Sequence, residues 1–176
     1  MTRRFCHRYG PGALPYASRR DVGGGVVMAA TGLLAAVLWF GGAGVLLAMG
    51  AGTGTGTLGF LIGVGVLFIP FVIPTAFILG FVLWRKYYPE ESRRVYGALY
   101  GGITGLGSLG VGALSPALLL AVSNVVNGRM TVIEGLGFFV LLLPVGFLFA
   151  VVAAGWLVVP LGMFGGWYHE RAKGVS

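Results

Sequence analysis

The chain has 176 residues, of which 57% are hydrophobic, only 10% are charged and 33 are glycine. Soluble domains carry about a quarter charged residues, so the mean hydropathy of +0.91 is too high for a soluble protein with one core. These values exclude an ordinary soluble enzyme, a disordered chain and a secreted disulfide-rich domain. With a single cysteine, Cys6, the composition predicts an integral membrane protein.

The chain begins with a basic tail, residues 1–21, which contains Arg3, Arg4, Arg8, Arg19 and Arg20. The first uncharged run, Val22–Met49, follows directly and exceeds the roughly 20 residues that a transmembrane helix needs. Residues 18–22, with their paired arginines, resemble a twin-arginine export signal. Cleavage after export is therefore an alternative to a first span that stays as an anchor.

Three further uncharged runs are Thr57–Trp84, Val95–Ser123 and Gly135–Trp167. Each is long enough for one span and too short for two. The last run is longer than the hydrocarbon layer is thick, so we expect Pro160–Trp167 at the interface or in a tilted end. The predicted transmembrane domain is 22–167, with spans at about 22–49, 57–84, 95–123 and 135–159, and the C-terminal tail is 168–176.

The links between these runs are short, which favours antiparallel neighbours. We therefore predict an all-α integral membrane protein with four transmembrane helices in an up-down-up-down bundle. Pro89 suits the first turn of the third helix, ahead of its uncharged run. Interior prolines predict kinks in the second, third and fourth helices. A weak similarity between the two helix hairpins leaves an internal duplication open.

Basic residues are concentrated at one end of the predicted bundle. Eleven of the 12 Lys and Arg lie in the two tails and in the link 85–94, and only Arg129 lies in the other links. The positive-inside rule then places both termini in the cytoplasm. We expect a multi-pass protein of the plasma membrane.

Small residues recur at helical spacing in the third run. Helices in lipid associate through close backbone approach, which glycine and serine allow. The predicted helix-packing seam is Gly97, Gly101, Gly105, Ser108 and Gly112. A dimerisation face is the alternative use of this seam.

The predicted spans carry no ionisable side chain other than tyrosine, whereas catalysis and proton-coupled transport need positioned acids, bases or metals. Cys6, His7 and His169 are too few for a tetrahedral zinc site. We therefore expect no enzymatic activity, cofactor, metal site or nucleic-acid partner.

The prolines suggest a second kind of site. A proline inside a helix leaves the carbonyl four residues earlier without its usual donor, and some transporters use such carbonyls to build polar sites. The predicted solute zone, in the outer half of the membrane, comprises Val66, Pro70, Ser108, Gly112, Ser115 and Val140.

At the inner face, basic residues are expected to contact anionic lipid headgroups. These residues are Arg19, Arg20, Arg85, Lys86, Arg93 and Arg94. The function that the sequence favours is a small structural or accessory subunit that acts through helix-face contacts with a membrane-protein partner or a second copy. The alternative is a small-solute channel or permease.

Overall fold

The computed structural model describes residues 20–51, 56–87 and 94–173, and within these ranges the chain is helical apart from short turns. The elements are α2 (Arg20–Ala48), α3 (Thr57–Lys86), α4 (Arg94–Gly112), α5 (Leu114–Val126), α6 (Val132–Ala150), the π-helical turn η2 (Val151–Gly155) and α7 (Trp156–Lys173). Four helical stretches are long and apolar enough to cross a membrane: Asp21–Ala48, Thr57–Lys86, Arg94–Val126 and Val132–Arg171. The all-α class and the number of candidate spans are confirmed.

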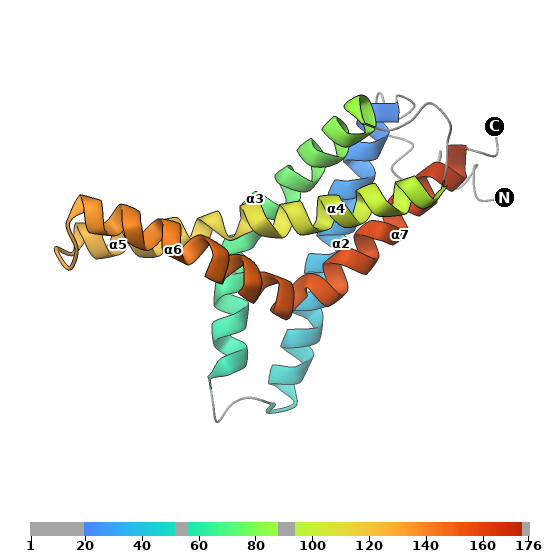
Figure 1. The fold of residues 1–176 in the computed structure, drawn as a ribbon. Helices are drawn as coiled ribbons and strands as arrows, with labels where there is room; N and C mark the ends of the chain where they lie inside the picture. The colour runs from blue at the N-terminus through green and yellow to red at the C-terminus, as the bar shows by residue number, and fades with distance from the viewer. Residues whose placement is uncertain (1–19, 52–55, 88–93, 174–176) are drawn as a thin grey trace.

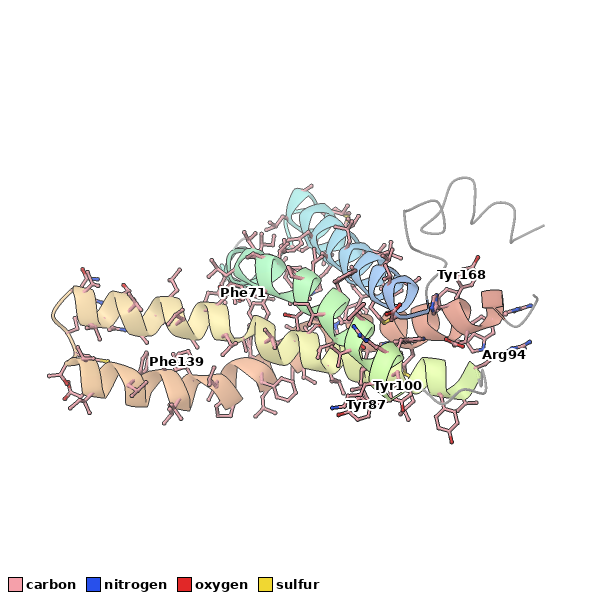
Figure 2. The ribbon with its side chains drawn as sticks, turned by 90° about the horizontal axis from the view of Figure 1, so that it is seen from above. Phe71, Tyr87, Arg94, Tyr100, Phe139 and Tyr168 are labelled. Atoms are coloured by element: carbon pink, nitrogen blue, oxygen red, sulfur yellow. The ribbon has the colours of Figure 1, made fainter. Side chains whose placement is uncertain are left out.

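The helices separate into one packed region and two diverging hairpins (Figure 1). We call the packed region the stem: the first half of α2, the second half of α3, and α4 and α7. The first arm is formed by residues 39–48 of α2 and 57–68 of α3. The second arm is the hairpin of α5 and α6, which extends away from the other helices (Figures 1 and 2). The two arms thus point in different directions away from the stem, whereas the helices of a parallel-sided bundle would stay together along their whole length (Figure 1).

The stem contains a hydrophobic cluster of the buried residues Met28, Ala76 and Trp84, with Val27, Leu83 and Tyr100 packed against it. Within the stem α2 packs on α3, and α4 packs on α7. Glycines set these approaches: a β-carbon on Gly80 would lie 2.8 Å from Cγ of Met28. Close packing of this kind is the main source of helix association in lipid.

Both outer turns end their helices in the same way. Gly50 and Gly128 have φ angles of 78° and 68°, in the left-handed region that favours glycine. The N–H groups of Ala51 and Arg129 donate to the carbonyls of Leu46 and Asn124, each at 2.9 Å. This is the Schellman arrangement, which satisfies the last carbonyls of a helix.

Helix α6 begins at Val132, three residues before its uncharged run, because Thr131 and Glu134 form a capping box. The Glu134 carboxylate accepts from the Thr131 backbone N–H at 2.7 Å, and the Thr131 hydroxyl accepts from the Glu134 N–H at 3.3 Å. The two groups satisfy backbone donors that the helix itself leaves open. The link between α5 and α6 is therefore shorter than the stretch 124–134 that separates the two predicted uncharged runs.

The helical stretch that contains the fourth predicted span is longer than that span. We expected a span ending near Val159 and a tail from residue 168, whereas the helix continues to Lys173. The physical reason is packing: α7 lies along α4, and Gly166, His169 and Glu170 are buried. The π-helical turn η2 divides this long stretch where its direction changes (Figure 1).

Prolines occupy different positions in these helices. Pro70 and Pro74 lie inside α3, Pro144 inside α6 and Pro160 inside α7. Pro116 follows the junction of α4 and α5 at Ala113, where it has no N–H to donate to the Gly112 carbonyl. The predicted start of the third helix at Pro89 lies outside the described residues.

Candidate functional site

The stem is built on direct backbone contact between α4 and α7. A β-carbon added to Gly97 would lie 2.5 Å from the carbonyl oxygen of Gly166, and one added to Gly162 would lie 2.6 Å from that of Gly101. No side chain fits at such distances. These two glycine pairs therefore set how closely the helices approach.

The same glycine face holds a buried carboxylate. Glu170 is only 1% exposed, and its Oε1 accepts from the Trp84 indole Nε1 at 2.8 Å. A β-carbon on Gly97 would lie 2.8 Å from Cγ of Glu170, so the glycine provides the space for this side chain. The contact joins the ends of α3, α4 and α7 in one place.

Two further rings surround Trp84. The His169 ring meets it edge-on at 5.9 Å between centroids, and the Tyr100 ring lies at 6.2 Å. The Tyr100 hydroxyl donates to the Tyr87 carbonyl at 2.9 Å, and both tyrosines are labelled in Figure 2. This group of side chains connects three helices at the charged end of the stem, and we call it the Trp84–Glu170 cluster.

The sequence did not predict this cluster, because residues 168–176 were expected to form a tail outside the helices. A usable signal was present: Gly162, Gly166 and Glu170 recur every four residues, so one helix would place all three on the same face. In the described part of the chain, no three or more His, Cys, Asp and Glu side chains are grouped so that they could hold a metal ion.

The predicted packing seam on α4 meets two different helices. Gly97 and Gly101 face α7, and a β-carbon on Gly105 would lie 3.3 Å from the Val158 carbonyl oxygen of α7. Gly112 instead faces α3, where an added β-carbon would lie 2.6 Å from Phe68. Ser108 is buried between them and borders a space of about 10 Å³.

The hydroxyls beside this small space are bonded within their own helices. Ser108 Oγ donates to the Thr104 carbonyl at 2.7 Å, Thr104 Oγ1 donates to the Tyr100 carbonyl at 2.8 Å, and Thr31 Oγ1 donates to the Met28 carbonyl at 2.9 Å. This is the usual way in which hydroxyls are accommodated in apolar helices.

The predicted solute zone is not brought together as one cavity. Val66 on the first arm and Val140 on the second arm are 52% and 58% exposed. Pro70 is also exposed, Ser115 is half-buried, and Ser108 and Gly112 lie inside the stem contacts. These residues therefore lie on different surfaces of the molecule.

A different cavity lies between the arms and the stem, and we call it the inter-arm cavity. Its volume is about 90 Å³, and it is open on one side. The residues that line it come from α2, α3, α4, α6, η2 and α7.

Two contacts hold the arms at this cavity. The Trp39 indole Nε1 on α2 donates to the Ala153 carbonyl in η2 at 3.1 Å, and Trp156 Nε1 donates to the same oxygen at 3.1 Å. The rings of Phe60 and Phe149 meet edge-on at 6.2 Å between centroids. The Trp39 hydrogen bond thus connects the π-helical turn to the first arm.

Three of the basic residues predicted to contact headgroups have described side chains, and these three lie at the end of the stem. Arg85, Lys86 and Arg94 are exposed. The Arg85 guanidinium lies over the Phe81 ring at 5.7 Å and the Lys86 amine lies 5.5 Å from the Tyr87 ring centroid. Arg19 and Arg93 lie outside the described residues, as does the side chain of Arg20.

The second arm exposes an apolar face along α6. Ile133 is 83% exposed and Leu141 and Leu148 are each 63% exposed. Gly137, between them, has no atom within 4 Å of the position of an added β-carbon. Together these residues form a stripe at helical spacing, which we call the α6 outer face.

Comparison of the chain with protein-family models, with curated proteins and with solved structures found no match.

Proposed function

We propose that this chain is a non-enzymatic accessory subunit of a membrane assembly, and that it binds a transmembrane helix of its partner through the α6 outer face. The observation that carries the proposal is the second arm, a two-helix hairpin that extends away from the stem with its apolar residues exposed (Figure 1). Ile133, Gly137, Leu141 and Leu148 fall within one face of the helix.

The chemistry of this face fits a helix as its partner. Lipid tails are as apolar as leucine, so association in a membrane depends on close packing rather than on burial of apolar surface. The open position at Gly137 allows a partner backbone to approach, and Ile133 and Leu141 provide exposed side chains on either side of it. This pattern is typical of helix interfaces in membranes.

The test is site-specific photocrosslinking in native membranes. A photoreactive residue at Leu141 is expected to give one discrete adduct, and the same residue at Leu109, which is 3% exposed inside the stem, is expected to give none. Mass spectrometry identifies the partner, and an adduct of twice the mass of the chain would make the partner a second copy.

A blocking variant sharpens this test. Gly137→Trp fills the open position on the α6 outer face and is expected to abolish the adduct. Because no atom lies within 4 Å of an added β-carbon there, thermal stability in detergent should not change. Crosslinks from Leu141 to lipid alone, or an adduct that Gly137→Trp leaves intact, would contradict the proposal.

We also propose the orientation and the lipid contacts of the subunit. The exposed side chains of Arg85, Lys86 and Arg94 support a cytoplasmic stem end that binds anionic headgroups, each contact being worth about 1 kcal/mol. Replacing all three with glutamine should reduce the amount of anionic lipid that copurifies with the chain. An unchanged lipid content would contradict the headgroup contacts.

The channel or permease alternative receives less support. The residues predicted for a polar solute zone lie on different surfaces, and the inter-arm cavity is lined almost entirely by apolar atoms.

A further inference from the structure

We propose that the inter-arm cavity is a binding site for one acyl chain of a membrane phospholipid. The site is separate from the α6 outer face, so the inference does not depend on the partner proposed above.

The lining selects hydrocarbon. Among the described residues that border the cavity, only Trp39 carries a polar side-chain atom, and its Nε1 already donates to the Ala153 carbonyl. The remaining side chains are aliphatic or aromatic, or glycine. A polar headgroup or an ion would lose its hydration here without a replacement, whereas a methylene chain would not.

The size of the cavity favours a chain over a helix. Along α2 it extends from Gly32 to Phe40, which is about 12 Å. A helix about 10 Å wide over that length would occupy roughly 900 Å³. The space itself has a volume of about 90 Å³, which is too small for such a helix.

The depth of the cavity indicates which leaflet supplies the lipid. On α2 its far edge, Phe40, is about 12 Å from the end of the helix at Ala48, whereas its near edge, Gly32, is about 18 Å from the start at Arg20. On α2 the space is therefore closer to the turn at Gly50 than to the basic stem end. A lipid of the leaflet on the side of that turn can reach it.

The walls of the site are held in place by contacts between the arms. The lining includes small residues on two walls, Ala35 and Ala36 on α2 and Ala150 and Ala154 at the junction of α6 and η2. The Trp39–Ala153 hydrogen bond and the Phe60–Phe149 ring contact tie these walls together. A site whose walls are fixed before binding loses less entropy when the chain enters.

The test uses the full chain in phosphatidylcholine nanodiscs that contain a small fraction of phosphatidylcholine with a diazirine on its acyl chain. After irradiation, peptides from the walls, residues 61–73 and 149–154, should carry the adduct in higher yield than the peptide that contains Leu141. Phosphatidylglycerol with the same labelled chain should give the same pattern, because the site recognises the chain rather than the headgroup.

Two variants on opposite walls test the location. Ala36→Leu and Ala154→Leu should each lower the wall adducts about tenfold, the loss expected when roughly two chain methylenes are displaced. Ala30→Leu, on the exposed side of the same helix α2, is the matched control and should leave the yield unchanged.

Several results would overturn the inference. These are equal labelling of the walls and of the α6 outer face, wall adducts that persist in both filled variants, a yield set by headgroup charge, or a protein crosslink in the cavity in place of lipid. The comparison of peptides in the unmodified chain stays decisive even if a filled variant does not fold.

Discussion

Glycines in the described part of the chain differ in what surrounds them. Gly101 in the stem faces the backbone of Gly162, where a β-carbon on Gly101 would lie 2.7 Å from the carbonyl carbon of its partner. Gly59 on the first arm has no atom within 4 Å of an added β-carbon. The same substitution should therefore have opposite effects in the two places.

We expect Gly101→Ala to lower the free energy of unfolding by about 1–3 kcal/mol, because the methyl group has no space between α4 and α7. Gly59→Ala is the matched control and should leave stability unchanged or raise it by up to about 1 kcal/mol, through helix propensity. SDS-induced unfolding in mixed micelles measures both. Equal effects of the two substitutions would contradict the packing described here.

The Trp84–Glu170 hydrogen bond gives a second prediction. Trp84→Phe removes the indole donor and leaves a buried carboxylate with one partner fewer, which should cost about 1–3 kcal/mol. In a Glu170→Ala background the same change should cost less, because the acceptor is already gone. A double-mutant cycle measures this coupling, and additive effects of the two substitutions would refute it.

How far the sequence predicts individual residues depends on the range of the interaction. The α4 glycine stripe was found because its spacing is local to one helix. Glu170 was missed because its burial depends on Gly97, which lies far away in the chain, and on Trp84. Hydropathy reads a charged residue near a chain end as exposed, and only the packing of α7 on α4 reverses that expectation.

At the level of helices, the uncharged runs predicted the number of spans and most of their extent. The ends were predicted less well, since they depend on side-chain bonds such as the Thr131–Glu134 capping box and on packing of the last turns of α7. The π-helical turn at Val151–Gly155 has no signal in hydropathy. The turn is held by a hydrogen bond from the Trp39 indole, on another helix, to the Ala153 carbonyl.

We expect Trp39→Phe to loosen the junction of the arms. The Ala153 carbonyl accepts hydrogen bonds from the Trp39 and Trp156 indoles, and only the Trp39 bond comes from another helix. The substitution removes this bond, which contributes about 1 kcal/mol. Spin labels at Ala51 and Arg129, with Cys6 replaced by serine, report the distance between the arm tips by pulsed electron resonance. The distance distribution should broaden.

Trp156→Phe is the matched control for this measurement. Trp156 donates to the same carbonyl, but from three residues along its own helix, and its side chain is 68% exposed. Its loss should leave the distribution between the arm tips as narrow as before. Identical distributions for both variants and the unmodified chain would show that the Trp39 bond does not hold the arms.

The molecule as a whole combines a predictable topology with an arrangement that the sequence does not encode locally. Four long apolar helices follow from composition and run length. The glycine pairs with direct backbone contact, Gly97–Gly166 and Gly101–Gly162, lie in the stem, whereas Gly59, Gly63 and Gly137 on the arms have no atom within 4 Å of an added β-carbon. This difference leaves the inter-arm cavity and the α6 outer face available, and both proposals depend on it.

The central claim is that the four helical stretches each cross the membrane once, with the stem end in the cytoplasm. Single cysteines at Ala51, Arg129, Tyr87 and Lys173, in a chain with Cys6 replaced by serine, test this with a membrane-impermeant thiol reagent on intact cells. We predict that the first two react at once and that Tyr87→Cys and Lys173→Cys react only after permeabilisation. Labelling of Ala51→Cys and Arg129→Cys from opposite sides, or of Tyr87→Cys together with Arg129→Cys, would contradict the topology and the proposals built on it.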